Sequence, residues 1–391
     1  MNRWLGVLIL VCLALALALA CSSGDDDDAT AADDDTGQAA DDDAATDDDA
    51  GPSGEATWMW IPIEGFTCRD GSKSGIAIRM NPQSDKLMVY LQGGGACYDP
   101  DSCADNPSHF GETDLAAILH TDLVSGIFNT KDSRNPVRDW NMVFVPYCTG
   151  DIFAGNQPDG AAPGVPGKQQ FVGFQNVQKI MMYIERHFSG ASQVLLSGTS
   201  AGGFGTLVAY APLADNFRDT PVILLDDSGP FVDSNAALPP CYQFLLRLLW
   251  NVTDSIPSGC RDCSQLNGDG ISNLLPYLAH HYPLGRFGLF SSLADATIRD
   301  YWGMGQNHCT GTGKVPADVY RAALLDERKN FLEPTGKWWT FYINGETHGI
   351  LTYEDTTADW VSFYSTAVGD MTFTGWLNDL ITDVGPLNVG P

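Results

Sequence analysis

Residues 193–202 read Gln-Val-Leu-Leu-Ser-Gly-Thr-Ser-Ala-Gly, which places a Gly-x-Ser-x-Gly pattern at the end of an apolar run. The apolar part predicts a buried strand, and the residues after Ser200 are compatible with a helix. In this context the serine lies on a tight strand-to-helix turn that raises its hydroxyl above the edge of a sheet. Ser200 is therefore a candidate nucleophile, although an ordinary glycine-rich turn can carry the same short pattern.

Six short runs rich in β-branched and aromatic residues predict the strands of one sheet. Most are continuous apolar runs, which are typical of parallel strands buried on both faces. Helix-compatible stretches separate several of them, the clearest being residues 169–188, where apolar residues recur at helical spacing. This alternation predicts an α/β fold with a mostly parallel sheet and helices on both faces. The predicted strands are residues 86–92, 141–147, 193–197, 221–226, 286–291 and 338–343.

The first twenty residues are typical of an export signal rather than of a folded domain. An apolar run from Trp4 to Ala20 follows Arg3, and it is short for a membrane span. Small residues then precede Cys21, an arrangement similar to a bacterial lipobox, in which Cys21 would carry the lipid. The sequence thus predicts an exported, membrane-anchored lipoprotein at the cell surface or in the periplasm, with a plain secretory signal as the alternative.

Residues 21–56 differ in composition from the rest of the chain. Between Ser22 and Glu55 there are thirteen aspartates and no aromatic residue, so this segment cannot bury enough apolar surface to fold and is predicted to be a disordered tether. Beyond Glu55, thirty-five acidic residues face twenty lysines and arginines, which argues against nucleic acid as a partner. Residues 57–391 have a suitable length for one elaborated α/β domain.

Eight cysteines lie in this domain, and an even number in an exported chain predicts disulfides. Cys260 and Cys263 have the spacing of a zinc-ligand pair, but a second pair at matching spacing is missing. We therefore expect a disulfide-stapled domain without a metal.

Polar groups that follow the predicted strands suggest a catalytic site, because open α/β sheets place their sites at the carboxyl ends of strands. Residues 92–96 read Gln-Gly-Gly-Gly-Ala after the first of these strands, and such a loop can present backbone N–H groups to an oxyanion. The N–H of Ala201, directly after the candidate nucleophile, would be a second donor. A tight turn is the alternative interpretation of the three glycines.

A nucleophilic serine needs a base and an orienting acid, which follow it in the order acid then histidine in α/β-hydrolases. His348 follows the last predicted strand, where such a base belongs, and His308 is its rival. Asp295 lies just past the preceding predicted strand and is the first candidate for the acid. Asp226 and Asp227 are the alternatives, and they could instead cap the turn that follows them.

Together these motifs resemble the pectin acetylesterase family, which includes the animal Notum carboxylesterases. The resemblance covers roughly residues 67–352, and the combination of motifs is specific although each alone is not. The motifs are Leu91-Gln92-Gly93-Gly94-Gly95-Ala96-Cys97, Pro146-Tyr147-Cys148-Thr149-Gly150-Asp151, Gly198-Thr199-Ser200-Ala201-Gly202-Gly203 and Thr347-His348-Gly349.

The resemblance implies an α/β-hydrolase-like fold and serine esterase chemistry without metal or cofactor. It implies Ser200 as nucleophile, His348 as base, Asp295 as acid, and Gly94, Gly95 and Ala201 at the oxyanion positions. It also implies two disulfides, Cys68 with Cys148 and Cys97 with Cys103, and leaves Cys241, Cys260, Cys263 and Cys309 unassigned. The chain departs from the plant and animal members at Gln92 and Ala96, which bears on acyl and leaving-group preference.

The expected function is removal of acetyl or other short acyl groups from a polysaccharide such as pectin, or from a small ester, by a monomeric enzyme. A surface lipoprotein that binds a glycan on a non-catalytic hydrolase fold is the alternative from another class. A peptidase or lipase on the same fold is a third possibility.

Overall fold

The computed structural model describes residues 57–310, 313–353 and 361–391. The predicted signal peptide (1–20), the lipidation site Cys21 and the tether (21–56) lie outside the described residues. In the part of the chain that is described, no helix is both long enough and apolar enough to cross a membrane.

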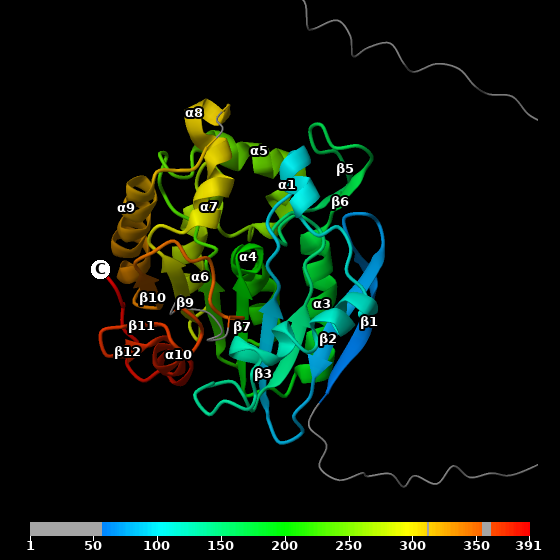
Figure 1. The fold of residues 1–391 in the computed structure, drawn as a ribbon, viewed down its shortest axis with the longest axis vertical. Helices are drawn as coiled ribbons and strands as arrows, with labels where there is room; N and C mark the ends of the chain where they lie inside the picture. The colour runs from blue at the N-terminus through cyan, green and yellow to red at the C-terminus, as the bar shows by residue number, and fades with distance from the viewer. Residues whose placement is uncertain (1–56, 311–312, 354–360) are drawn as a thin grey trace, which may run out of the picture. The chain divides into compact units, whose positions relative to one another are not determined.

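The core of the domain is an eight-stranded sheet in the order β1-β2-β4-β3-β7-β8-β9-β10. Strands β4, β3, β7, β8, β9 and β10 are mutually parallel, and they correspond to the six predicted strands. Their bounds are β3 (Lys86–Leu91), β4 (Asn141–Val145), β7 (Gln193–Thr199), β8 (Val222–Asp227), β9 (Arg286–Ser292) and β10 (Trp338–Ile343). The prediction of a mostly parallel α/β sheet is confirmed (Figure 1).

Two antiparallel strands, β1 (Trp58–Thr67) and β2 (Lys73–Arg79), extend the sheet at one edge. The sequence analysis did not predict them. β1 contains Pro62 and has mixed burial, as an edge strand does, so it lacks the continuous apolar run that identifies the inner strands.

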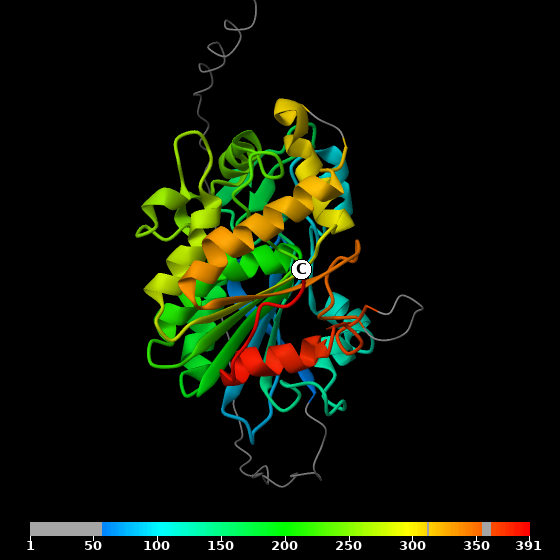
Figure 2. The same cartoon turned by 90° about the vertical axis from the view of Figure 1, so that its left-hand side faces the viewer.

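Helices cover both faces of the sheet. Phe287 of β9 packs against Tyr210 of α4 (Ala201–Asn216), whereas the adjacent Gly288 faces Leu380 of α10 (Phe373–Thr382). Because successive strand residues point to opposite faces, α4 and α10 lie on opposite sides of the sheet, as Figure 2 shows.

Helix α3 (Gly173–Phe188) begins later than predicted, because residues 169–171 form the short strand β6, which pairs with β5 (Gln157–Gly160). Apolar spacing alone extended the helix into this strand. A second small sheet consists of β11 (Ala367–Val368) and β12 (Met371–Thr372). The remaining α-helices are α1 (Pro100–Asp105), α2 (Glu112–Ile118), α5 (Pro240–Trp250), α6 (Leu274–His281), α7 (Ala296–Tyr301), α8 (Gln306–Cys309) and α9 (Ala317–Glu327).

Four disulfides staple the domain. Cys68 is joined to Cys148 and Cys97 to Cys103, which are the pairings that the resemblance implies. The four cysteines without an assigned partner form the bridges Cys241–Cys309 and Cys260–Cys263. All four bridges join segments that follow the C-terminal ends of strands.

Candidate active site

Ser200 occupies the sharp turn between β7 and α4. Its backbone has φ 59° and ψ −119°, a conformation that an L-residue adopts at a cost of roughly 1–3 kcal/mol. The Ser200 N–H donates a hydrogen bond to the Asp227 carbonyl of the neighbouring strand at 2.8 Å, which supports the turn. The strained serine predicted from the Gly-x-Ser-x-Gly pattern is therefore present at the carboxyl edge of the sheet.

The two glycines of the pattern are required by close backbone approaches. A Cβ on Gly202 would lie 1.9 Å from the Leu91 carbonyl oxygen, and one on Gly198 would lie 2.4 Å from the Gly202 oxygen. Any larger residue at either position would push α4 away from β3 and β7. The glycines thus fix the place at which the helix begins behind the serine.

The glycine loop after β3 lies against the serine turn, since a Cβ on Gly93 would be 3.3 Å from the Ser200 Cβ. Gly94 and Gly95 have φ values of +154° and +77°, which favour glycine. The Asn106 side-chain amide donates to the Gly94 carbonyl at 2.6 Å. Because the carbonyl and N–H of a trans peptide point in opposite directions, this bond directs the Gly95 N–H away from Asn106.

The next peptide of the loop, between Gly95 and Ala96, lies between two tyrosine hydroxyls. Tyr147 donates to the Gly95 carbonyl at 3.0 Å, and the hydroxyl of Tyr301 packs against Gly95. The Tyr301 oxygen lies so close that a Cβ on Gly95 would approach it to 2.0 Å. Burial raises the pKa of Tyr301, so the hydroxyl keeps its proton. We call Asn106, Tyr147 and Tyr301 the loop clamp.

Asp295 and His348 meet at the carboxyl ends of β9 and β10. Asp295 is fully buried, and its Oδ2 lies 2.8 Å from the His348 Nδ1. Its other oxygen, Oδ1, accepts the N–H groups of Thr297 and Ile298 at 3.0 Å, so the carboxylate caps α7 and cannot rotate freely. A carboxylate held in this way fixes the orientation of the imidazole and its Nδ1 tautomer.

The rival acid Asp227 has another place. It is fully buried, and its Oδ2 accepts the N–H groups of Ile350 and Leu351 and the hydroxyl of Thr199 at 2.8–3.0 Å. Burial raises its pKa, opposed by those N–H groups. Since the carbonyl of the same residue accepts the Ser200 N–H, Asp227 joins the serine turn to the loop that follows His348.

The other rivals also lie apart from the Asp295–His348 pair. Asp226 accepts the Gly229 N–H at 2.7 Å and caps the turn after β8, which was the alternative interpretation of this residue. His308 is exposed, in the short helix α8. The described residues contain no group of three or more His, Cys, Asp or Glu side chains arranged to hold a metal ion.

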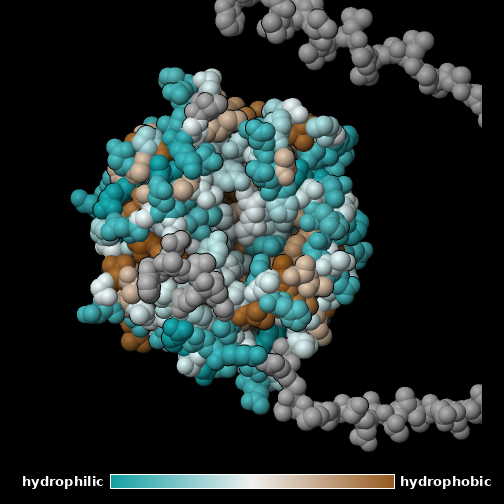
Figure 3. All heavy atoms as spheres, viewed as in Figure 1, coloured by the Kyte–Doolittle hydropathy of each residue, from teal (hydrophilic) through white to brown (hydrophobic). Residues whose placement is uncertain are grey.

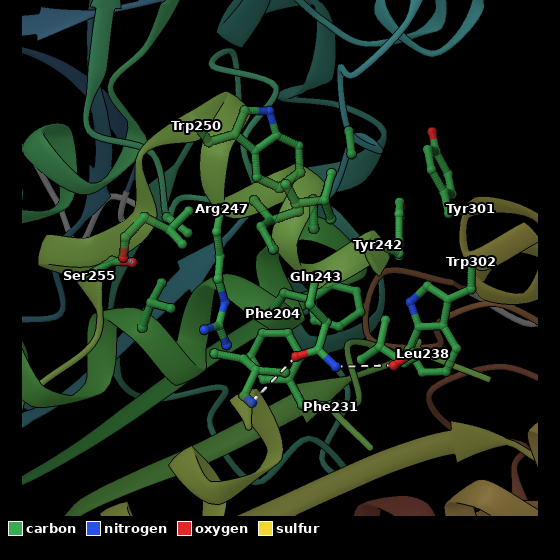
Figure 4. Close-up of a pocket in the computed structure, with 18 of the residues that line it drawn as sticks. Phe204, Phe231, Leu238, Tyr242, Gln243, Arg247, Trp250, Ser255, Tyr301 and Trp302 are labelled. Atoms are coloured by element: carbon green, nitrogen blue, oxygen red, sulfur yellow. Dashed lines mark hydrogen bonds between the residues drawn. The ribbon is translucent and has the colours of Figure 1, made fainter. Parts of the chain in front are cut away.

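A cavity begins at Ser200 and the glycine loop. Its walls are almost entirely apolar, and Figure 4 shows the aromatic rings that form much of them. They include Phe204, Phe231, Tyr242, Trp250 and Trp302. The outer face seen in Figure 3 is by contrast mostly hydrophilic. The cavity therefore suits an apolar group next to the serine hydroxyl.

Much of the cavity wall comes from residues 240–273, which we call the cap. The cap contains α5 and the short helical turns at Val252–Ser255, Arg261–Cys263 and Ile271–Asn273. Of the loop clamp, only Tyr147 lies in a motif that the sequence singles out, Pro146–Asp151. Asn106, Tyr301 and the cap are distant from it in sequence, and no local motif marks them.

Comparison with known proteins agrees with the geometry. The family model described as Pectinacetylesterase matches residues 60–267, more than half of the chain. Mouse "Palmitoleoyl-protein carboxylesterase NOTUM" is 30% identical over 178 residues, which cover 43% of this chain and 34% of that protein. Xenopus laevis "Palmitoleoyl-protein carboxylesterase notum2" is 32% identical over 182 residues, 43% and 35% of the two chains. The matched part spans about a third of the length of these relatives.

A solved structure described as the Wnt deacylase Notum from Drosophila aligns with a TM-score of 0.62. The alignment covers 85% of this chain and 96% of that chain at 20% sequence identity, so the likeness concerns the fold. It confirms the prediction of an α/β-hydrolase-like fold.

Proposed function

Because the chain belongs to the pectinacetylesterase family, we propose that it hydrolyses carboxylic esters by a Ser-His-Asp acyl-enzyme mechanism. The observation that carries the proposal is the 2.8 Å contact between His348 and the buried carboxylate of Asp295, at the sheet edge where Ser200 occupies its strained turn. The non-catalytic glycan-binding alternative gives no reason for a buried carboxylate held against a histidine there.

In the proposed mechanism the Ser200 hydroxyl attacks the ester carbonyl while His348 Nε2 takes its proton. Asp295 accepts the Nδ1–H and stabilises the imidazolium that forms. The N–H groups of Gly94, Gly95 and Ala201 stabilise the oxyanion, and removal of one such donor costs roughly 3 kcal/mol in serine hydrolases. The imidazolium protonates the leaving alcohol. Water, activated by the same histidine, then releases the acid from the acyl-enzyme.

We propose acetyl or another short acyl group on a polysaccharide such as pectin as the substrate. The apolar cavity supports a second candidate, an ester with a longer acyl chain, because apolar side chains from α4, α5 and the rest of the cap line it, more than an acetyl methyl group could contact. The relatives named as palmitoleoyl-protein carboxylesterases fit that second candidate.

We also propose that the protein is exported as a monomer and anchored to a membrane by a lipid on Cys21. Four disulfides in the described residues support an oxidising compartment.

The test is a burst-phase assay of the purified protein with 4-nitrophenyl acetate, wild type against Ser200→Ala. We expect a stoichiometric burst of 4-nitrophenol from the wild type and none from the variant, with equal melting temperatures. Equal hydrolysis by both proteins would refute Ser200 as the nucleophile. Repeating the assay with butyrate, octanoate and palmitate esters separates the two acyl candidates. If the apolar cavity holds a longer acyl chain, kcat/KM should be higher for these esters than for the acetate.

A further inference from the structure

Helix α5 of the cap has an unusual distribution of residues between its faces. Phe244 and Leu248 point outward, with exposed fractions of 51% and 70%. Arg247, the one charged residue of this helix, lies on the inner face with Gln243 and Trp250, among the residues that line the cavity. A helix at a protein surface normally has the opposite arrangement, with apolar residues inward and charges outward.

The guanidinium of Arg247 is bonded only to neutral groups. Its Nη1 donates to the Ser264 hydroxyl at 2.7 Å and its Nη2 to the Cys263 carbonyl at 2.8 Å. A guanidinium has five N–H donors, so three remain for another partner. No ion pair among the described residues includes Arg247, and Asp269, the one carboxylate with an electrostatic effect on it, is bound to Gln243 and to the Gly270 N–H.

Figure 4 shows the Arg247 side chain extending from α5 among the residues that line the cavity, toward Phe204. Burial of this side chain lowers its pKa, although an arginine remains charged at any working pH. A charge that is partly removed from water without an ion-pair partner is costly in an apolar wall, and such a group is typical of a site that receives an anion from a ligand.

We propose that Arg247 forms a subsite for a carboxylate of the substrate, so that the enzyme prefers esters that carry a negative charge. This inference rests on the proposed esterase function and narrows its substrate class. The free N–H groups of Arg247 would donate to the two carboxylate oxygens, the pairing for which a guanidinium is best suited. The carboxylate belongs either to the acyl part or to the alcohol part of the ester. In both cases it would accept hydrogen bonds from the Arg247 guanidinium.

The first arm of the test places the charge on the acyl part. The purified protein is assayed with 4-nitrophenyl hydrogen glutarate and with 4-nitrophenyl valerate, which has the same chain length and no charge. We expect Arg247→Met to lower the ratio of the two kcat/KM values by roughly ten-fold to a hundred-fold, because an interaction between charged groups is lost. Because the valerate carries no charge, the ratio separates loss of the charge interaction from any general effect of the substitution on turnover.

The second arm places the charge on the alcohol part, with 4-acetoxybenzoate compared with methyl 4-acetoxybenzoate. A loss of charge preference in either arm supports the subsite and identifies the part of the substrate that carries the anion. An unchanged preference in both arms would overturn the subsite and leave Arg247 as a residue that only holds the Cys263 and Ser264 segment.

Two further variants keep the test decisive. Arg261→Met removes an exposed positive charge from the same cap and should leave both ratios unchanged, which controls for long-range electrostatics. Arg247→Lys keeps the positive charge and should retain part of the preference. It takes the place of Arg247→Met in the test if that variant does not fold. Valerate turnover without any charge preference contradicts the subsite alone, whereas absence of turnover with every ester contradicts the esterase function and the subsite with it.

Discussion

The carboxyl edge of the sheet and the cap meet at one cavity, but they are built in different ways. At the edge, the parallel strands β7, β9 and β10 are followed by Ser200, Asp295 and the loop to His348, and each of these residues is held by backbone hydrogen bonds or by a buried carboxylate. In the cap, a single helix with outward apolar residues and short helical turns is stapled by disulfides. The edge holds the proposed catalytic groups, and the cap forms much of the cavity wall beside them.

This difference explains why the reaction is easier to infer than the substrate. The position of a group at a strand end is fixed by the sheet, so any sequence that forms the sheet also places the group. The cavity walls depend on contacts between loops, which vary without disturbing the sheet. The variants below test the edge and its surroundings one residue at a time, beginning with the largest expected effect.

The two buried acids of the edge should differ most clearly. We expect Asp295→Asn to lower kcat by about 10⁴-fold, because an asparagine facing Nδ1 favours the wrong imidazole tautomer. Asp227→Asn should keep kcat within about ten-fold of the wild-type value, because the side-chain amide oxygen of the asparagine can still accept the N–H groups of Ile350 and Leu351.

The measurement is kcat with 4-nitrophenyl acetate together with the melting temperature of each variant. Asp227→Asn should mainly lower the melting temperature, whereas Asp295→Asn should mainly lower kcat. A 10⁴-fold loss in Asp227→Asn with full activity in Asp295→Asn would reverse the two assignments.

The sequence was informative at the edge for a physical reason. Short runs rich in apolar, β-branched and aromatic residues located all six parallel strands, and the polar residues after them gave the candidates Ser200, Asp295 and His348, which the structure brings to one edge. It could not separate Asp295 from Asp227, because both follow a buried strand. Only the positions of α7 and of the loop after β10 decide which carboxylate reaches the imidazole.

Asn106 and Tyr301 of the loop clamp, and the whole cap, had no comparable signal. Tyr301 is one of thirteen tyrosines, and its contact with the glycine loop joins residues about two hundred positions apart. Arg247 lies in a stretch whose apolar residues would have been assigned to the core, whereas the structure exposes Phe244 and Leu248. Pairwise contacts of this kind depend on the tertiary fold and cannot be obtained from spacing along the chain.

The loop clamp offers a smaller test of how rigidly the edge is held. Tyr301→Phe keeps the ring but removes the hydroxyl that packs against Gly95, so the glycine loop loses one restraint. We expect kcat to fall by about ten-fold with KM nearly unchanged, because oxyanion donors act mainly in the transition state. The measurement is steady-state kinetics with 4-nitrophenyl acetate.

Tyr98→Phe is the matched control for this variant. The Tyr98 ring packs edge-on against Tyr301 with centroids 6.3 Å apart, but its hydroxyl interacts with Tyr242 and not with the loop. Equal losses of kcat in both variants would assign the effect to general packing. An increase in KM alone for Tyr301→Phe would instead place the hydroxyl in substrate binding.

The smallest effect concerns the segment between the edge and the cap, which carries the cavity residues Phe231 and Leu238. Glu327 of α9 is buried and accepts the Asp233 N–H of this segment at 2.8 Å. Burial, with the neighbouring carboxylates of Asp233 and Asp326, raises the pKa of Glu327 from 4.5 to about 8. The folded protein therefore holds a proton that the unfolded chain releases above its ordinary pKa.

The sign of the pH dependence follows from this difference. The contribution of Glu327 to stability is complete below about pH 4.5, decreases as the pH rises toward 8, and is constant above that value. A glutamine at this position accepts the same Asp233 N–H and does not titrate. We expect Glu327→Gln to melt roughly 5 °C above the wild type at pH 8.5, and to lose this advantage near pH 5. If the difference in melting temperature between the two proteins stays the same across this pH range, Glu327 titrates normally. In that case it does not couple pH to the segment that lines the cavity.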